Sequence, residues 1–154
     1  ALLGARGFYV ADFARSHPGG PLGRRLLTRV RDVMVSGSAL PMVGIEATLG
    51  EAVVAMSSKG MGMTAVVDAS GRIAGIFTDG DLRRCLDRVR DVAAVPVVEV
   101  MTRTPRKIDP LQLAVDCVEI MEAAPKVSQL LVVDDGDRLV GALHLHDLFR
   151  ARIV

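Results

Sequence analysis

The stretch Val66-Val67-Asp68-Ala69-Ser70-Gly71-Arg72-Ile73-Ala74-Gly75 recurs as Val132-Val133-Asp134-Asp135-Gly136-Asp137-Arg138-Leu139-Val140-Gly141. The offset is a constant 66 residues, and it continues from Asp81-Leu82 to Asp147-Leu148. Such self-similarity is typical of a structure that uses one unit twice. We therefore predict two units, at 30–87 and 97–154, with a linker at 88–96 and a separate segment at 1–29. Because each unit is too short to bury a stable core alone, the two should pack face to face with pseudo-twofold symmetry.

Each repeat has the same pattern of local signals, which predicts the order strand, helix, strand, strand, helix. In the first repeat, Thr48 and Glu51 form a capping box ahead of apolar residues at helical spacing, and Gly60 is a plausible end of that helix. In the second repeat, Asp109 should cap a helix that has Pro110 at its first position. The fold class is α/β (α+β). The other expected elements are an extended segment around 40–43, strands at 64–67, 73–77, 130–133 and 139–143, and closing helices at 79–88 and 146–152.

Composition excludes several classes of protein. The chain of 154 residues is 50% hydrophobic but only 3% aromatic, and Lys+Arg at 19 against Asp+Glu at 18 give a net charge of +1. This balance disfavours a nucleic-acid partner, and no apolar run approaches the ~20 residues that a membrane helix needs. Cys85 and Cys117 form neither a disulfide framework nor a metal-binding CxxC pair. A reducing cytoplasmic compartment fits these features best, and we expect no membrane partner, metal or cofactor.

The repeated unit resembles the CBS domain, and the tandem resembles a CBS pair (a Bateman module). The resemblance is carried by Asp32-Val33-Met34, by Thr64-Ala65-Val66-Val67-Asp68 and by Gly75-Ile76-Phe77-Thr78-Asp79-Gly80-Asp81-Leu82. It implies a β-α-β-β-α unit in which the hydroxyl of Thr78 and the carboxylate of Asp81 bind the ribose of a nucleotide. Read without the resemblance, Thr78-x-x-Asp81 is also a capping box for the closing helix, and the two roles are compatible.

The second unit departs from the motif, because His144 stands where the first unit has Thr78. Since histidine is a poor cap, we expect Asp147 to lack a capping partner and the two clefts to be chemically unequal. His144 and His146 alternate, so in a strand they would face the same side. They could contact an anionic ligand at the cleft or form hydrogen bonds at an interface. A metal site would need further ligands that no regular spacing supplies.

Four further residues are candidate ligand contacts. Arg83 follows the ribose motif directly, and because adjacent helical residues point about 100° apart, we expect only one residue of the Arg83–Arg84 pair to face a cleft. Lys126 is a second candidate for an anion contact, although such side chains are commonly only solvated. Met63 and Thr64 lie where a nucleotide base packs in CBS modules, but a methionine there is more often core filler.

Residues 1–29 carry a second resemblance. The run Ser16-His17-Pro18-Gly19-Gly20-Pro21-Leu22-Gly23-Arg24, taken with the two CBS motifs, is similar to the D-arabinose 5-phosphate isomerases. That family is cytoplasmic, joins a sugar isomerase (SIS) domain to a CBS pair, and interconverts ribulose 5-phosphate and arabinose 5-phosphate for Kdo and lipopolysaccharide biosynthesis. The resemblance implies that the SIS domain is missing here and that His17 is a catalytic residue only in the full enzyme. No catalysis is expected from this chain alone.

These observations predict a regulatory, ligand-sensing CBS pair. The resemblance points to a nucleotide or nucleotide sugar as the ligand, either an adenine nucleotide or a pathway product such as CMP-Kdo. We also expect a homo-oligomer. The alternative function is a ligand-free oligomerisation module of the same enzyme.

Overall fold

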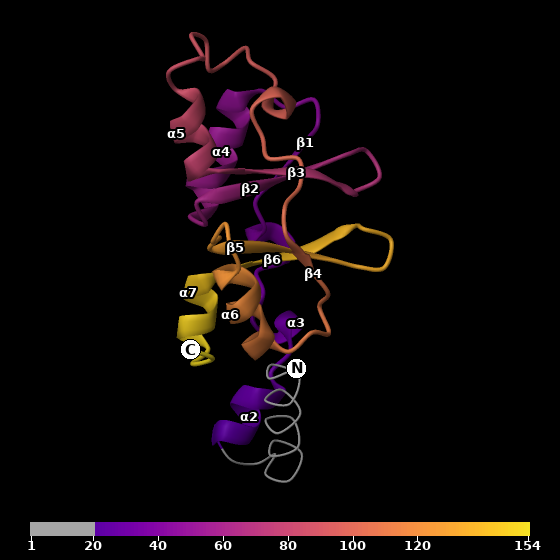
Figure 1. Ribbon diagram of the computed structural model, residues 1–154. Helices are drawn as coiled ribbons and strands as arrows, with labels where there is room; N and C mark the ends of the chain where they lie inside the picture. Colours follow the sequence, from indigo (N-terminus) through magenta and orange to yellow (C-terminus); the bar gives the residue numbers. More distant parts are fainter. Residues whose placement is uncertain (1–20) are drawn as a thin grey trace.

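The structure, a computed structural model, describes residues 21–154 and shows two small sheets with helices along one side (Figure 1). Each sheet has three strands, in the orders β1-β2-β3 and β4-β5-β6. The predicted α/β architecture is confirmed. The elements are α2 Pro21–Leu27, α3 Val30–Val33, β1 Met42–Gly44, α4 Leu49–Lys59, β2 Met63–Val67, β3 Ile73–Thr78, α5 Asp79–Cys85, β4 Lys107–Ile108, α6 Ala114–Glu122, β5 Gln129–Val133, β6 Leu139–His144 and α7 Leu145–Arg150, with single 3₁₀ turns at Gly37–Ala39 and Val97–Glu99.

The two sheets repeat each other in register as well as in sequence. The first strand of each sheet is parallel to the second, and the second is antiparallel to the third. Both antiparallel pairs shift register at the same point, between Val66 and Val67 and between Val132 and Val133. The 66-residue offset of the sequence is therefore an offset between equivalent positions of two structurally equivalent units.

The signals that bound α4 act as predicted. The hydroxyl of Thr48 accepts a hydrogen bond from the Glu51 N–H at 3.2 Å, which satisfies one of the free amides at the helix start. Gly60 ends the helix with a φ of 68°, a left-handed conformation that glycine adopts without a steric penalty. The closing helices α5 and α7 also form, but they end at Cys85 and Arg150, earlier than the sequence predicts.

The predicted start of α6 is wrong. The helix begins at Ala114 rather than at Pro110, because the residues before it form a turn. The Asp109 carboxylate accepts from the Leu111 N–H at 2.7 Å, and the Gln112 side chain accepts from the Asp109 N–H at 2.7 Å. The carbonyls of Pro110 and Gln112 then accept from the N–H groups of residues 31 and 30. A tertiary contact thus replaces the first helical turn.

The segment that opens each repeat packs on the opposite unit. Val30 is fully buried in the core of the second unit, with Leu130 and Leu143, whereas Val97 is fully buried in the core of the first unit, with Phe77. The backbone follows the same exchange. Val35 pairs with Ala142 of β6, and Thr102 pairs with Ile76 of β3, through two hydrogen bonds of 2.8–2.9 Å in each case.

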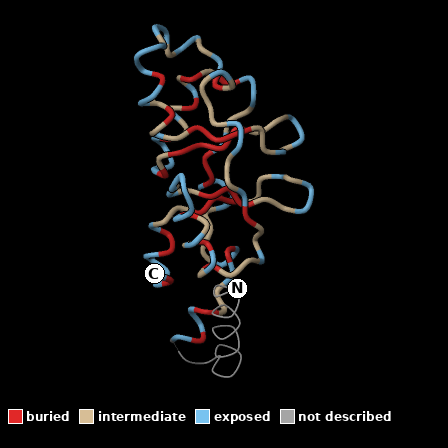
Figure 2. Tube along the Cα trace, in the orientation of Figure 1, coloured by how far each residue is buried: buried red, intermediate tan, exposed pale blue. Residues whose placement is uncertain are grey.

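A third apolar cluster joins the two sheets to each other. It contains Met63 and Ala65 from β2, Ile76 from β3, and Leu131 and Ala142 from the second sheet. In Figure 2 the buried segments are concentrated in these facing strands. The two units are therefore joined by this cluster between the sheets as well as by the exchanged segments. No helix among residues 21–154 is long and apolar enough to span a membrane.

Candidate functional site

A cleft of about 730 Å³ lies where the two units meet. Three segments line it: the end of β3 with the start of α5, the irregular segment 102–106 before β4, and residues 125–129, which lead from α6 into β5. His144, at the end of β6, completes the wall. Because both units contribute, a molecule bound here would contact both.

Thr78 and Asp81 form the capping box that the spacing predicts. The Thr78 hydroxyl accepts from the Asp81 N–H at 3.2 Å, and the Thr78 N–H donates to Asp81 Oδ2 at 3.0 Å. Thr78 also lines the cleft. Thr78 therefore caps α5 and lines the cleft, so the two interpretations of this motif are compatible.

The Asp81 carboxylate lies beneath the cleft surface and is only 6% exposed. Its Oδ2 accepts from the N–H and the hydroxyl of Thr78, and its Oδ1 accepts from Arg84 Nη2 at 2.7 Å and from the Thr102 hydroxyl at 2.9 Å. A carboxylate has about four acceptor sites, so these four donors occupy them all. A ligand hydroxyl can bind Asp81 only if Arg84 or Thr102 releases it.

Four cationic side chains line the cleft, against the single acid Asp79. Arg83 is exposed and forms no hydrogen bond or ion pair with any residue of the described part of the chain. Arg106 donates through Nη1 to the Ile120 carbonyl at 2.6 Å and through Nη2 to the Pro125 carbonyl, which fixes its guanidinium beside the end of α6. Lys126 pairs with Glu122 at 3.2 Å in an exposed contact that is worth little.

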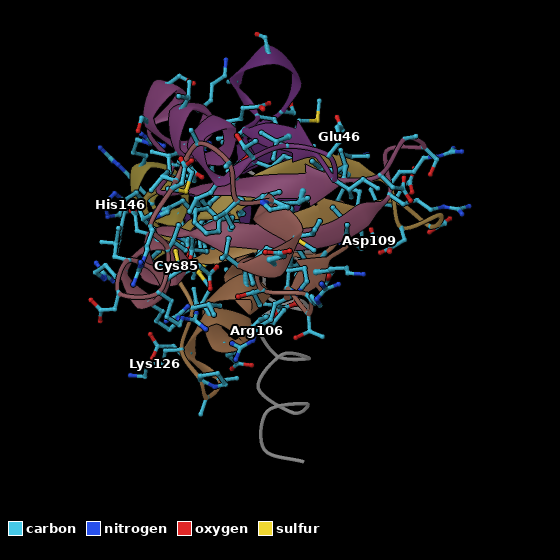
Figure 3. The ribbon with its side chains drawn as sticks, turned by 90° about the horizontal axis from the view of Figure 1, so that it is seen from above. Glu46, Cys85, Arg106, Asp109, Lys126 and His146 are labelled. Carbon is cyan, nitrogen blue, oxygen red and sulfur yellow. The ribbon has the colours of Figure 1, made fainter. Side chains whose placement is uncertain are left out.

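The expectation that only one arginine of the Arg83–Arg84 pair faces the cleft is wrong, since both line it. The cleft spreads around the first turns of α5, and the Arg84 side chain folds back to Asp81. Sequence reasoning also missed Arg106 and Thr102, because their position depends on the exchange of segments between the units. The labelled Arg106 and Lys126 lie near one another in Figure 3, which shows the molecule from above.

His144 caps α7, contrary to the expectation that histidine would leave Asp147 without a partner. Its Nδ1 accepts from the His146 N–H at 3.0 Å, and its own N–H donates to Asp147 Oδ2 at 2.8 Å. His146 lies in the first turn of α7 rather than in a strand, and the two imidazoles make an edge-to-face contact at 4.5 Å. Asp147 also pairs with Arg150.

Burial lowers the pKa of His144 below its usual value, and the neighbouring His146 lowers it further. A protonated imidazole has no acceptor, so protonation removes the cap on the His146 amide. Because the folded-state pKa is depressed, this contribution to stability is present above the unfolded pKa of about 6.5 and is lost as the pH falls through the folded value.

We expect an NMR titration to place the His144 pKa below 6.5. In His144→Asn, which keeps an acceptor at every pH, the acid sensitivity of α7 should disappear; an unchanged acid response would contradict this role.

Besides the buried Asp81, four other predicted site residues do not line the cleft. Met63 and Thr64 are fully buried because β2 is the central strand of its sheet and is covered on both faces. His146 is exposed outside the cleft, and Asp147, in the first turn of α7, is buried. His17 lies outside the described residues. Within residues 21–154 no group of three His, Cys, Asp or Glu side chains could hold a metal ion.

Curated relatives match the whole chain. It is 53% identical to the arabinose 5-phosphate isomerase KdsD of Pseudomonas aeruginosa over 154 residues, which are all of this chain and 47% of that protein. The corresponding protein of Escherichia coli K12 is 47% identical over the same 154 residues, 46% of its length. The chain therefore spans about half the length of the curated relatives it matches.

Solved structures show the same fold. An acetoin utilization protein (AcuB) from Vibrio cholerae is 23% identical with a TM-score of 0.73, over 83% of this chain and 92% of that one. The CBS domain pair of MJ0100, solved with 5-methylthioadenosine and S-adenosylmethionine, is 25% identical with a TM-score of 0.69, over 80% of this chain and 94% of that one. The CBS domain model matches the sequence twice, at residues 30–88 and 89–154. The chain belongs to the CBS domain family and contains two CBS domains in tandem.

Proposed function

We propose that this CBS pair is the regulatory part of a cytoplasmic arabinose 5-phosphate isomerase and that it senses a nucleotide or nucleotide sugar in the cleft at Thr78. The parent enzyme would interconvert ribulose 5-phosphate and arabinose 5-phosphate, with His17 acting beside a SIS domain. The identity to the KdsD isomerases over the whole chain supports the choice of parent. The MJ0100 structure, whose printed ligands are both adenosine derivatives, supports the class of ligand.

The observation that carries the proposal is that Thr78 and four cationic side chains line one cleft between the units, while the Asp81 carboxylate that is hydrogen-bonded to Thr78 is buried beside them. Thr78 and Asp81 suit a ribose diol, while Arg83, Arg106 and Lys126 suit phosphate or carboxylate groups. Arg84 holds the Asp81 carboxylate, but its side chain is 67% exposed and free to turn outward. An incoming anion would draw Arg84 away and leave Oδ1 available to the sugar.

Such binding provides a physical route to regulation. Thr102 lies in the segment that opens the second unit and packs on the first, and its hydroxyl donates to the same Asp81 oxygen that a diol would take. A ligand that displaces Thr102 favours one arrangement of that segment over another, which is the differential affinity that allostery requires. A pathway product such as CMP-Kdo, with both a ribose and a carboxylate, fits the two halves of the cleft.

Calorimetric titration of the chain with CMP-Kdo, AMP and ATP tests the proposal. We expect at least one of them to bind, and Asp81→Asn to weaken that binding at least tenfold, because the amide offers one acceptor oxygen where the carboxylate offers two. Asp147→Asn, at the equivalent position of the second unit, is the matched control and should leave the affinity unchanged. Circular dichroism confirms that both variants remain folded. No binding of any of the three, or an equal effect of the two variants, would contradict the proposal.

Assembly without a ligand is the second candidate function. It is favoured by large apolar side chains that stay exposed on or beside the helices, including Val54 on α4, Leu86 at the end of α5 and Phe149 on α7. A protein that forms a stable oligomer in size-exclusion chromatography and binds none of the three ligands would support this candidate instead.

A further inference from the structure

The two halves of this protein are equivalent in backbone but not in charge, and the charge difference bears on where an anion can bind. The equivalences follow from the strand register. The Ala65 N–H donates to the Pro41 carbonyl at 3.1 Å, and the Leu131 N–H, 66 positions later, donates to the Arg106 carbonyl at 3.0 Å. Pro41 therefore occupies, in the first unit, the place that Arg106 occupies in the second.

The same comparison holds along the closing helices. α5 and α7 begin at capping boxes that are 66 residues apart, so Arg83 of α5 is equivalent to Phe149 of α7. Phe149 is 53% exposed and lies beside the His146 ring, at a centroid distance of 6.3 Å. In the cleft at Thr78, Arg83 has no ion-pair partner in the described part of the chain. At the equivalent surface of the second unit, around Asp147, an aromatic ring stands in its place; we call this the second surface.

The remaining positions complete the contrast. Arg84 is matched by Arg150, and the two arginines make the same ion pair with the aspartate of their capping box. Lys126 is matched by Gly60, with Lys59 one position earlier. Asp79, the single acid of the first cleft, is matched by Leu145. At these positions the surface around Asp147 thus has Arg150, which is already paired with Asp147, and Lys59 one position away.

We propose that the protein binds one phosphate-bearing anion per chain, in the Thr78 cleft, and that Arg83, Arg106 and Lys126 determine this choice. This inference rests on the proposed function only for the location of the site; the shared chemistry is a phosphate group, carried either by a free phosphate compound or by a nucleotide. Arg106 is fixed by its two carbonyl contacts and provides a preset charge, while the exposed Arg83 and Lys126 close on the ligand from the other walls. The capping-box aspartates Asp81 and Asp147 cannot select one unit over the other for anion binding, because each unit has such an aspartate.

Inorganic pyrophosphate is the probe, since it carries the phosphate chemistry without a sugar or base. Calorimetry should give a stoichiometry of one pyrophosphate per chain. Arg83→Phe/Lys126→Ala, which copies the second surface at one position and removes a charge at another, should weaken binding at least tenfold. Both side chains lack buried partners, so the variant should unfold at the wild-type urea concentration. Arg31→Ala/Lys59→Ala removes the same two charges elsewhere, including the lysine nearest the second surface, and should bind as the wild type does.

Each outcome decides the inference separately from the proposed function. Two pyrophosphates per chain, equal losses in the two double variants, or no pyrophosphate binding would each overturn it. If pyrophosphate binds once but CMP-Kdo, AMP and ATP do not bind, the inference stands and the nucleotide-sensing proposal fails. Competition between pyrophosphate and a nucleotide that binds would place both in the same cleft.

Discussion

Gly75→Ala should destabilise the protein by about 3 kcal/mol, although the substitution adds one methyl group. A Cβ at position 75 would lie 2.6 Å from the Thr102 carbonyl oxygen and 2.7 Å from Met101 Sδ. The first of these atoms belongs to backbone that is paired with Ile76 by two hydrogen bonds, so it cannot retreat without breaking them. The backbone angles of Gly75 are not left-handed, so the whole cost comes from this contact.

Urea unfolding followed by far-UV circular dichroism measures this effect, and two other glycines calibrate it. At Gly141, 66 positions later, the nearest atom is Met34 Sδ at 2.5 Å and the nearest backbone atom is the Val35 oxygen at 3.0 Å. Because a methionine side chain can move, Gly141→Ala should cost less than Gly75→Ala. Gly136→Ala meets nothing closer than an Asp134 side-chain oxygen at 3.5 Å and should be nearly neutral. The reverse order of costs would contradict the close-approach argument.

The local features of the fold could be predicted from the sequence because their causes are local. The Thr48 cap and the Gly60 stop depend on a few neighbouring residues, and the predicted strands at 64–67, 73–77, 130–133 and 139–143 follow the repeat. The start of α6 could not be predicted this way. Asp109 and Pro110 have the chemistry of a helix start, but hydrogen bonds from residues 30 and 31, distant in sequence, take the carbonyls of that turn.

The residues of the candidate site also fall into those that local motifs predict and those that only tertiary contacts place. Thr78, Arg83, Lys126 and His144 were predicted and do line the cleft. Thr102 and Arg106 were missed, because neither lies in a motif and both reach the cleft only because the segment that opens the second unit packs on the first. The cap at His144 was also missed. Histidine is generally a poor N-cap residue, but here its Nδ1 accepts a hydrogen bond from the His146 N–H.

Phe77→Ala and Leu143→Ala should each lower the stability of the whole protein, by about 3–5 and 2–5 kcal/mol respectively. Both side chains are fully buried, at equivalent positions 66 residues apart in different units. If the units were independent, each substitution would unfold only its own half. The crosswise packing predicts otherwise, since the core around Phe77 includes Val97 and the core around Leu143 includes Val30.

The reason is that neither half can lose its core without exposing a part of the other. Unfolding of the first unit releases Val97 and the Thr102 pairing, and this frees the segment that leads into β4. It also exposes the cluster between the sheets, where Leu131 and Ala142 pack on Met63 and Ile76. Unfolding should therefore be a single cooperative transition.

Hydrogen exchange under native conditions, resolved for β2 and β5, measures both strands at once. In the wild type their slowest amides should exchange with the same free energy of opening, and each substitution should lower both values by the same amount. Val54→Ala, on an exposed face of α4, should change neither by more than about 0.5 kcal/mol. A substitution that lowers protection in one strand and spares the other would show two separable domains. Ligand binding at the Thr78 cleft could then not reach both halves through their shared core, and only backbone pairings such as those at Thr102 and Val35 would remain to link them.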